Sequence, residues 1–162
     1  ARNALNYALL EAAADTHKPI LLKRGIASTI QEWLLAAEYI AKQGNSNVIL
    51  CERGIRTFET ATRNTLDLGA IGVTKLESRL PVLADPSHGA GRWDLIDPLS
   101  RAAIAVGADG LLIEVHPEPE MALSDGDQQL QPVDFADLMK KISPFVQAAG
   151  RVLSNPSATP VA

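Results

Sequence analysis

The sequence predicts an α/β fold built from four consecutive strand–helix units. Continuous apolar runs rich in Ile, Leu and Val are typical of strands buried on both faces of a parallel sheet. Their starts recur at intervals of roughly 30 residues, the length of a strand with its crossover helix and return loop. The four runs are Pro19 to Leu22, Val48 to Cys51, Leu80 to Ala84 and Leu111 to Val115.

The first two runs are each followed by a segment with helical sequence signals. Ser28 and Gln31 have the spacing of a capping box, and the apolar stripe that begins at Trp33 ends at Gly44, a residue suited to a helix C-terminus. After the second run, the pattern predicts a helix from Phe58 to Leu68, with Gly69 behind it.

Helices are also predicted after the third and fourth runs. Asp97-Pro98 indicates the head of a helix that ends at Gly107. Asp134 is a candidate cap for a helix that runs to Ala149, in which Pro144 introduces a kink or a break. We therefore expect residues 1–150 to form one structural unit and residues 151–162 to form a flexible tail.

Two folds are compatible with this order of elements. One is an open doubly wound sheet, and the other is half of a closed eight-stranded barrel. No Gly-x-Gly-x-x-Gly fingerprint follows any of the runs, so the dinucleotide-binding version of the open sheet has no direct support. Periodicity alone leaves both folds open.

Composition excludes several classes of protein. The chain has 162 residues, 46% hydrophobic and 21% charged, which is enough apolar material for one core. No apolar run is long enough for a membrane helix, and the first residues do not resemble a signal peptide, so we expect a cytoplasmic protein without membrane contact.

The net charge of −4 argues against nucleic-acid binding. The single cysteine, Cys51, forms no internal disulfide and is more typical of a core position. The start at Ala1 without methionine suggests a segment of a longer sequence.

Charged residues follow each apolar run, at the edge of the sheet where both candidate folds bind ligands. The basic ones, which suit carboxylate and phosphate groups, are Lys23, Arg24 and Arg53, joined by Arg2 near the start of the chain. The imidazole and oxygen donors, which suit Mn, Fe, Co or Zn, are Asp85, His88, Glu114, His116 and Asp125. We therefore expect an anionic substrate beside a divalent metal.

Structural alternatives exist for several of these residues. Arg24 and Glu52 can form a salt bridge at the rim, and Asp85 can cap the turn that follows it. Glu114 needs a partner, because a carboxylate that follows apolar residues in a buried strand is costly without one. His116 can be a ligand, a hydrogen-bond donor to a ligand, or a structural histidine.

Ala1-Arg2-Asn3 and five further segments together resemble the metal-dependent 3-deoxy-7-phosphoheptulonate synthases of the compact microbial subclass. The resemblance extends from Ala1 to about Ile142. The related 3-deoxy-octulosonate-8-phosphate synthases share Cys-Glu-Arg-Gly but continue differently and carry threonine at the position of Ser87, so the run from Gly54 to Thr65 favours the heptulonate enzyme. The five segments are residues 18–25, 50–59, 85–89, 113–119 and 122–126.

The resemblance implies a (β/α)₈ TIM barrel, of which this chain supplies strands five to eight. It implies that His88, Glu114 and Asp125 are three of four metal ligands, and that Arg2, Lys23 and Arg53 hold the phosphate and carboxylate of phosphoenolpyruvate. Lys23 and His88 are the expected catalytic residues, and erythrose 4-phosphate is the expected second substrate. The family's cysteine ligand and its Lys-Pro-Arg-Thr motif have no counterpart in this chain, and Cys51 stands in a different motif.

Half of a barrel leaves unpaired strand edges and an exposed apolar inner face. The remaining half-barrel can come from the rest of the polypeptide, which we favour, from a second copy, or from a separate chain, and we expect a homo-oligomer. Two competing hypotheses are a noncatalytic fragment or assembly module and a different barrel lyase or aldolase with the same rim chemistry.

Overall fold

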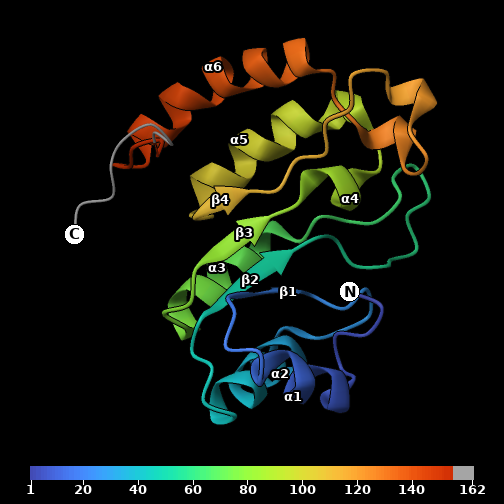
Figure 1. The fold of residues 1–162 in the computed structure, drawn as a ribbon. Helices are drawn as coiled ribbons and strands as arrows, with labels where there is room; N and C mark the ends of the chain where they lie inside the picture. The colour runs from blue at the N-terminus through green and yellow to red at the C-terminus, as the bar shows by residue number, and fades with distance from the viewer. Residues whose placement is uncertain (155–162) are drawn as a thin grey trace.

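The computed structural model, which describes residues 1–154, contains one parallel sheet whose strands follow the order of the chain. The order is β1-β2-β3-β4, and at no point within the described residues does it reverse as in a doubly wound sheet. The prediction of four parallel strands is confirmed, and the arrangement is that of four consecutive units of a barrel (Figure 1). The strands are β1 (Ile20–Lys23), β2 (Val48–Glu52), β3 (Val82–Ala84) and β4 (Gly110–Leu111).

Helices cover one face of this sheet (Figure 1). Trp33 is fully buried between helix and sheet, and its indole Nε1 donates a hydrogen bond to the carbonyl oxygen of Leu22 at 3.1 Å. A second apolar cluster joins α5 and α6 through Ile104 and Ile142. The α-helices are α1 (Tyr7–Ala14), α2 (Ile30–Lys42), α3 (Leu68–Glu77), α4 (Pro86–Ala90), α5 (Ile96–Val106) and α6 (Pro132–Ala148), and the 3₁₀ turns are η1 (Trp93–Leu95), η2 (Pro119–Met121) and η3 (Gly126–Gln128).

The start of α2 has the predicted capping box, displaced by one residue. Thr29, not Ser28, is the N-cap: its hydroxyl accepts from the backbone N–H of Glu32, and the Glu32 carboxylate accepts from the Thr29 N–H. Ser28 instead closes a turn by donating its N–H to the carbonyl of Gly25. Because both residues are hydroxyl-bearing and adjacent, the spacing rule could not separate them.

The predicted helix from Phe58 to Leu68 is wrong, because residues 58–67 form an irregular loop and α3 begins at Leu68. Threonines are frequent in this loop, and such side chains favour local hydrogen bonds over a helix. The Glu59 carboxylate accepts from the two backbone N–H groups that follow it. The Arg63 N–H donates to the carbonyl of Ala90, so the loop is bound to the segment that follows β3.

Strand β4 is shorter than predicted, and α4 was not predicted. Asp85 accepts from the backbone N–H of His88 and starts α4, so β3 ends at Ala84 and offers no further backbone partners. The last ladder bond runs from the Leu112 N–H to the carbonyl of Ala84. Beyond it, the N–H of Glu114 donates to the Ser87 hydroxyl at 3.0 Å instead of to a strand.

The later helices agree in position with the prediction but differ in detail. Gly107 ends α5 with φ of +107°, a conformation suited to glycine. Helix α6 begins at Pro132, so Asp134 lies in its first turn rather than at its cap, and the helix continues through Pro144. The predicted tail is residues 151–162, of which 155–162 lie outside the described residues. Within the described part of the tail, Arg151 binds Asp109 and the carbonyl of Ala108.

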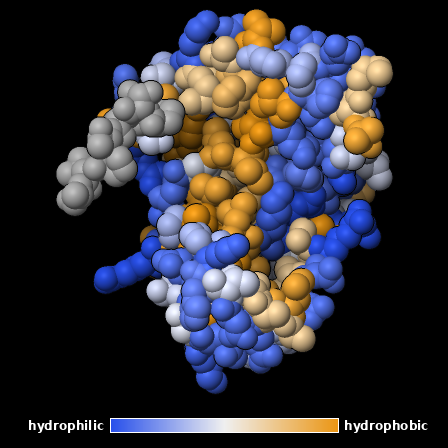
Figure 2. Space-filling view, viewed as in Figure 1, coloured by the Kyte–Doolittle hydropathy of each residue, from blue (hydrophilic) through white to orange (hydrophobic). Residues whose placement is uncertain are grey.

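The sheet face opposite the helices is apolar and partly open. Leu21 is 39% exposed, and Ile49, Leu83 and Leu112 on the same face are half-buried. Figure 2 shows apolar side chains gathered in a hollowed strip on this side of the molecule. A groove of about 660 Å³ lies beside β4 and α6. None of the described helices is both long and apolar enough to cross a membrane.

Candidate metal and anion site

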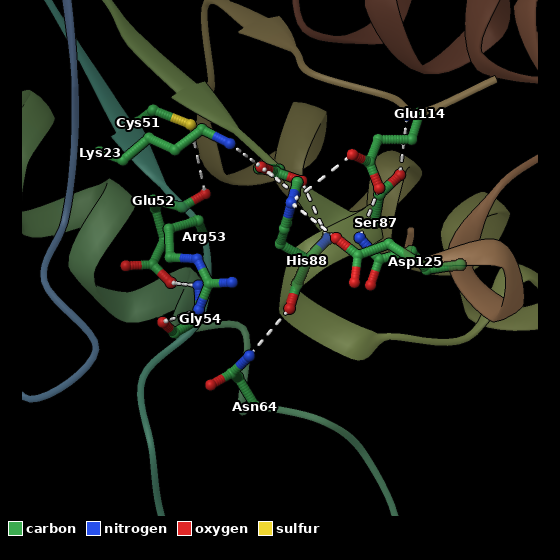
Figure 3. A network of polar contacts seen from close by, with 12 residues as sticks. Lys23, Cys51, Glu52, Arg53, Gly54, Asn64, Ser87, His88, Glu114 and Asp125 are labelled. Atoms are coloured by element: carbon green, nitrogen blue, oxygen red, sulfur yellow. Dashed lines mark hydrogen bonds and ion pairs between the residues drawn. The ribbon is translucent and has the colours of Figure 1, made fainter. Parts of the chain in front are cut away.

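Side-chain alternation divides the charged strand ends into two sets. Lys23 pairs in register with Cys51, so it shares the face opposite the helices, and Arg53 and Asp85 continue that alternation. The neighbouring Arg24 and Glu52 fall on the helix side. Figure 3 shows the side chains of Lys23, Arg53 and His88 directed toward a common space.

The helix-side pair forms a buried structural network. Arg24 is 4% exposed and Glu52 is 0% exposed, and their Nη1 and Oε2 atoms lie 3.1 Å apart. Glu52 also accepts from the backbone N–H groups of Gly54 at 2.6 Å and Asp67 at 3.2 Å. Burial raises the pKa of Glu52, and these donors and Arg24 oppose that rise. The salt-bridge interpretation of Arg24 and Glu52 is therefore the one that the geometry supports.

The ligand atoms of three predicted metal ligands lie close together. Ligand atoms of His88, Glu114 and Asp125 all lie within 4.8 Å of one another. His88 Nε2 lies 3.6 Å from Glu114 Oε1 and 3.9 Å from Asp125 Oδ2. Metal–ligand bonds of about 2.0–2.2 Å place neighbouring ligand atoms roughly 3–3.5 Å apart, so these separations leave room for an ion between the three groups. The donor set suits a divalent transition metal or zinc.

Further side chains hold the two carboxylates in place. Gln128, 2% exposed, donates from Nε2 to Glu114 and accepts at Oε1 from Arg63 at 2.7 Å. Arg63 also donates to Asp125 Oδ1 at 2.8 Å. Asp125 has φ of +56°, so its backbone turns sharply and its carboxylate faces His88. Gln128 and Arg63 were not among the predicted site residues, because an amide and an arginine in polar loops carry no sequence signal for this role.

Asp85 lies next to the three ligands without belonging to the group. It is fully buried, and its Oδ2 lies 2.8 Å from both Lys23 Nζ and His88 Nδ1. Burial alone would raise the pKa of Asp85, but the hydrogen bonds from His88 and Lys23 outweigh burial and leave that pKa lowered. The capping alternative is correct for Asp85, and the carboxylate also contacts two predicted site residues.

Arg53 is a buried cation whose charge is not matched by an ion pair within the described residues. It is 6% exposed, and its side chain makes a single, long hydrogen bond of 3.5 Å among the described residues, to the carbonyl of Gly54. Burial lowers the pKa of Arg53, and the charge of Asp85 partly compensates. A guanidinium held in this way is suited to an incoming anion.

The other predicted site residues lie outside the group formed by His88, Glu114 and Asp125. Arg2 is exposed, at the end of the chain that lies near the same edge of the sheet (Figure 1). His116 accepts at Nδ1 from the backbone N–H of Glu118 and lies outside the group of ligands. Cys51 is buried, and burial raises the pKa of its thiol to about 12, as expected for a core cysteine rather than a ligand.

Comparison with known proteins gives the chain a family context. A family model described as the DAHP synthetase I family matches residues 1–148. The curated phospho-2-dehydro-3-deoxyheptonate aldolase of Thermotoga maritima is 59% identical over 150 residues, which cover 93% of this chain and 44% of that protein. A 2-dehydro-3-deoxyphosphooctonate aldolase from Magnetococcus marinus is 32% identical over 145 residues, which cover 82% of this chain and 49% of that protein.

A solved structure supports the same relationship. The chain matches a truncated form of 3-deoxy-D-arabino-heptulosonate 7-phosphate synthase from Thermotoga maritima with a TM-score of 0.92 and 57% identity, over 94% of this chain and 58% of that one. The chain therefore spans about half the length of the curated relatives that it matches.

Proposed function

Since the chain belongs to the DAHP synthetase I family, we propose that it is the metal-binding half of a 3-deoxy-7-phosphoheptulonate synthase. The proposed reaction condenses phosphoenolpyruvate with erythrose 4-phosphate and releases phosphate, as the first step toward aromatic amino acids. The observation that carries the proposal is the meeting of His88, Glu114 and Asp125 beside the cations Lys23 and Arg53. A divalent ion and an anionic substrate would then share one pocket.

The basic residues bind and position the anionic substrate. Arg53 offers a planar set of donors for a carboxylate or phosphate, and the ammonium of Lys23 lies on the same face of the sheet. Arg2 adds charge at the same edge. Holding a trianionic substrate beside these cations lowers the cost of bringing a second phosphorylated molecule close to it.

His88, Glu114 and Asp125 would hold Mn, Fe, Co or Zn, and such an ion polarises a carbonyl oxygen when bound. In the proposed chemistry, the third carbon of phosphoenolpyruvate bonds to the aldehyde carbon, water adds to the second carbon, and phosphate leaves. Lys23 is suited to supply a proton, because its Nζ is fixed by Asp85 while a quarter of its side chain stays exposed.

The second candidate, a 3-deoxy-octulosonate-8-phosphate synthase, has weaker support. The heptulonate relative is 59% identical, whereas the octulosonate relative is 32% identical over a comparable length. We therefore assign the four-carbon sugar phosphate, rather than a five-carbon one, as the second substrate.

We further propose that four more strand–helix units complete the barrel and that the whole protein forms a homo-oligomer. The open edges of β1 and β4 and the groove of about 660 Å³ beside β4 support this completion. We take residues 1–150 as the C-terminal half of the catalytic barrel. In this half, His88, Glu114 and Asp125 supply three ligands and leave coordination positions for a residue of the other half and for substrate.

A chimera tests the proposed function. This chain replaces the matching segment of the Thermotoga maritima relative, and phosphate release is measured with phosphoenolpyruvate and either erythrose 4-phosphate or arabinose 5-phosphate. We expect release with erythrose 4-phosphate and its loss in the His88→Ala chimera. Preference for arabinose 5-phosphate would identify the octulosonate enzyme. An inactive chimera that binds no Mn²⁺ would refute the proposal, and the same assay on the chain alone decides whether the half is catalytically sufficient.

A further inference from the structure

Asp85 joins two parts of the site through one carboxylate. Its Oδ1 accepts from the backbone N–H of His88 at 3.0 Å, which caps α4. Its Oδ2 faces both Lys23 Nζ and the ring Nδ1 of His88, each at 2.8 Å. The carboxylate is fully buried, so water does not compete for these positions.

This arrangement decides which nitrogen of His88 is free. A carboxylate oxygen accepts hydrogen bonds, so the ring nitrogen that faces it carries the hydrogen. That nitrogen is Nδ1, and the lone pair of the neutral ring is left on Nε2. Nε2 is the atom directed at the carboxylates of Glu114 and Asp125, at 3.6 and 3.9 Å.

We propose that Asp85 is a positioning residue, which orients the His88 ring and fixes its Nδ1–H tautomer so that Nε2 can bind a divalent ion. Lys23 makes this possible because its ammonium balances the buried negative charge beside the ring. The inference rests on the proposed function, since it concerns the same metal site. Outer partners of this kind change metal affinity by about 10- to 100-fold when they are replaced.

Asp85→Asn separates this role from the capping role. Asparagine caps helices as well as aspartate does, so its Oδ1 can keep the bond to the His88 N–H. Its Nδ2 then takes the place of Oδ2 and presents a hydrogen-bond donor to Nδ1. The ring is driven to the Nε2–H tautomer, in which the atom that faces Glu114 and Asp125 cannot bind metal.

Asp67→Asn is the matched control. Asp67 also lies after a strand and caps a helix. It is the N-cap of α3, since its Oδ1 accepts from the Ala70 N–H at 2.9 Å. Its Oδ2 likewise meets a cation, Arg24, at 3.0 Å. The substitution removes the same charge and leaves a cap, but no histidine contacts Asp67 among the described residues.

Two measurements on the 162-residue chain and both variants test the inference. Electron paramagnetic resonance of free Mn²⁺ gives the metal affinity, and nitrogen-15 NMR of the histidine rings without metal gives the tautomer of His88. We expect about 10- to 100-fold weaker Mn²⁺ binding and a shift to the Nε2–H tautomer in Asp85→Asn. Asp67→Asn should match the unsubstituted chain in both readouts.

The possible failures are distinguishable. Mn²⁺ binding of unchanged strength in Asp85→Asn, with the Nδ1–H tautomer retained, would overturn the positioning role and leave the proposed function standing. An unsubstituted chain whose His88 carries its hydrogen on Nε2 would overturn the role as well. An unsubstituted chain that binds no Mn²⁺ would refute the metal site itself, and the inference with it.

Discussion

Arg24 and Arg53, which follow the neighbouring strands β1 and β2, provide a direct comparison, because methionine at each should affect stability and substrate binding differently. Arg24 is ion-paired with fully buried Glu52, whereas Arg53 is buried without an ion pair in the described part of the chain. Methionine keeps much of the arginine stem and removes the charge. Arg24→Met therefore leaves a buried carboxylate without its cation, while Arg53→Met removes a charge that burial disfavours.

The expected magnitudes follow from this difference. Breaking a buried ion pair by removing one partner costs about 3–5 kcal/mol. Glu52 keeps two backbone donors, so we expect Arg24→Met to lie near the lower end of that range. Arg53→Met should leave the free energy of unfolding unchanged or raise it. Its effect should fall on phosphoenolpyruvate, where a lost charged hydrogen bond of about 1.5–3 kcal/mol weakens binding roughly 10- to 150-fold.

Urea unfolding and calorimetric titration with phosphoenolpyruvate measure the two effects separately. The stability lost in Arg24→Met should shrink at acid pH. Burial raises the pKa of Glu52 in the folded state, and its unfavourable charge disappears as pH falls through that raised value. An Arg53→Met variant less stable than Arg24→Met would contradict these expectations, and so would an Arg24→Met variant that loses substrate affinity while it keeps its stability.

Three further predictions concern other parts of the site. Gln128→Leu should weaken Mn²⁺ binding measured by paramagnetic resonance, because Glu114 loses the amide that orients it; unchanged affinity would exclude that role. Gly54→Ala should lower the urea midpoint, since Gly54 has φ of +87° and an added Cβ would lie 2.9 Å from Gly89 Cα; a midpoint equal to the unsubstituted value would contradict this. Cys51, with its pKa raised to about 12, should resist iodoacetamide at pH 8 until urea unfolds the chain, and rapid labelling of the folded chain would contradict its burial.

The strands were predictable because each depends on a local pattern of apolar residues, and candidate donors were predictable because they follow those strands. Apolar runs located all four strands, and the charged residues that follow parallel strands must meet at one edge of the sheet. These patterns left five candidate donors, Asp85, His88, Glu114, His116 and Asp125. The family resemblance singled out His88, Glu114 and Asp125, whose ligand atoms lie within 4.8 Å of one another. Whether they bind metal in solution remains a prediction.

The irregular segments were not predictable from local patterns. Residues 58–67 have a spacing that permits a helix, but the loop is held by tertiary contacts to Gly89 and Ala90 that no short pattern records. Helix α4 is only five residues long, too short for a periodic signal. Gln128 becomes a site residue only because the fold brings it against Glu114 and Arg63.

A crystal structure of the chain grown with Mn²⁺, with anomalous scattering data, would locate the ion and so test the proposed metal site. We expect one anomalous peak coordinated by His88 Nε2 and by carboxylate oxygens of Glu114 and Asp125, with Lys23 and Arg53 facing the same space. A peak bound elsewhere, or density that shows these three ligand side chains too far apart to share one ion, would contradict the proposed site.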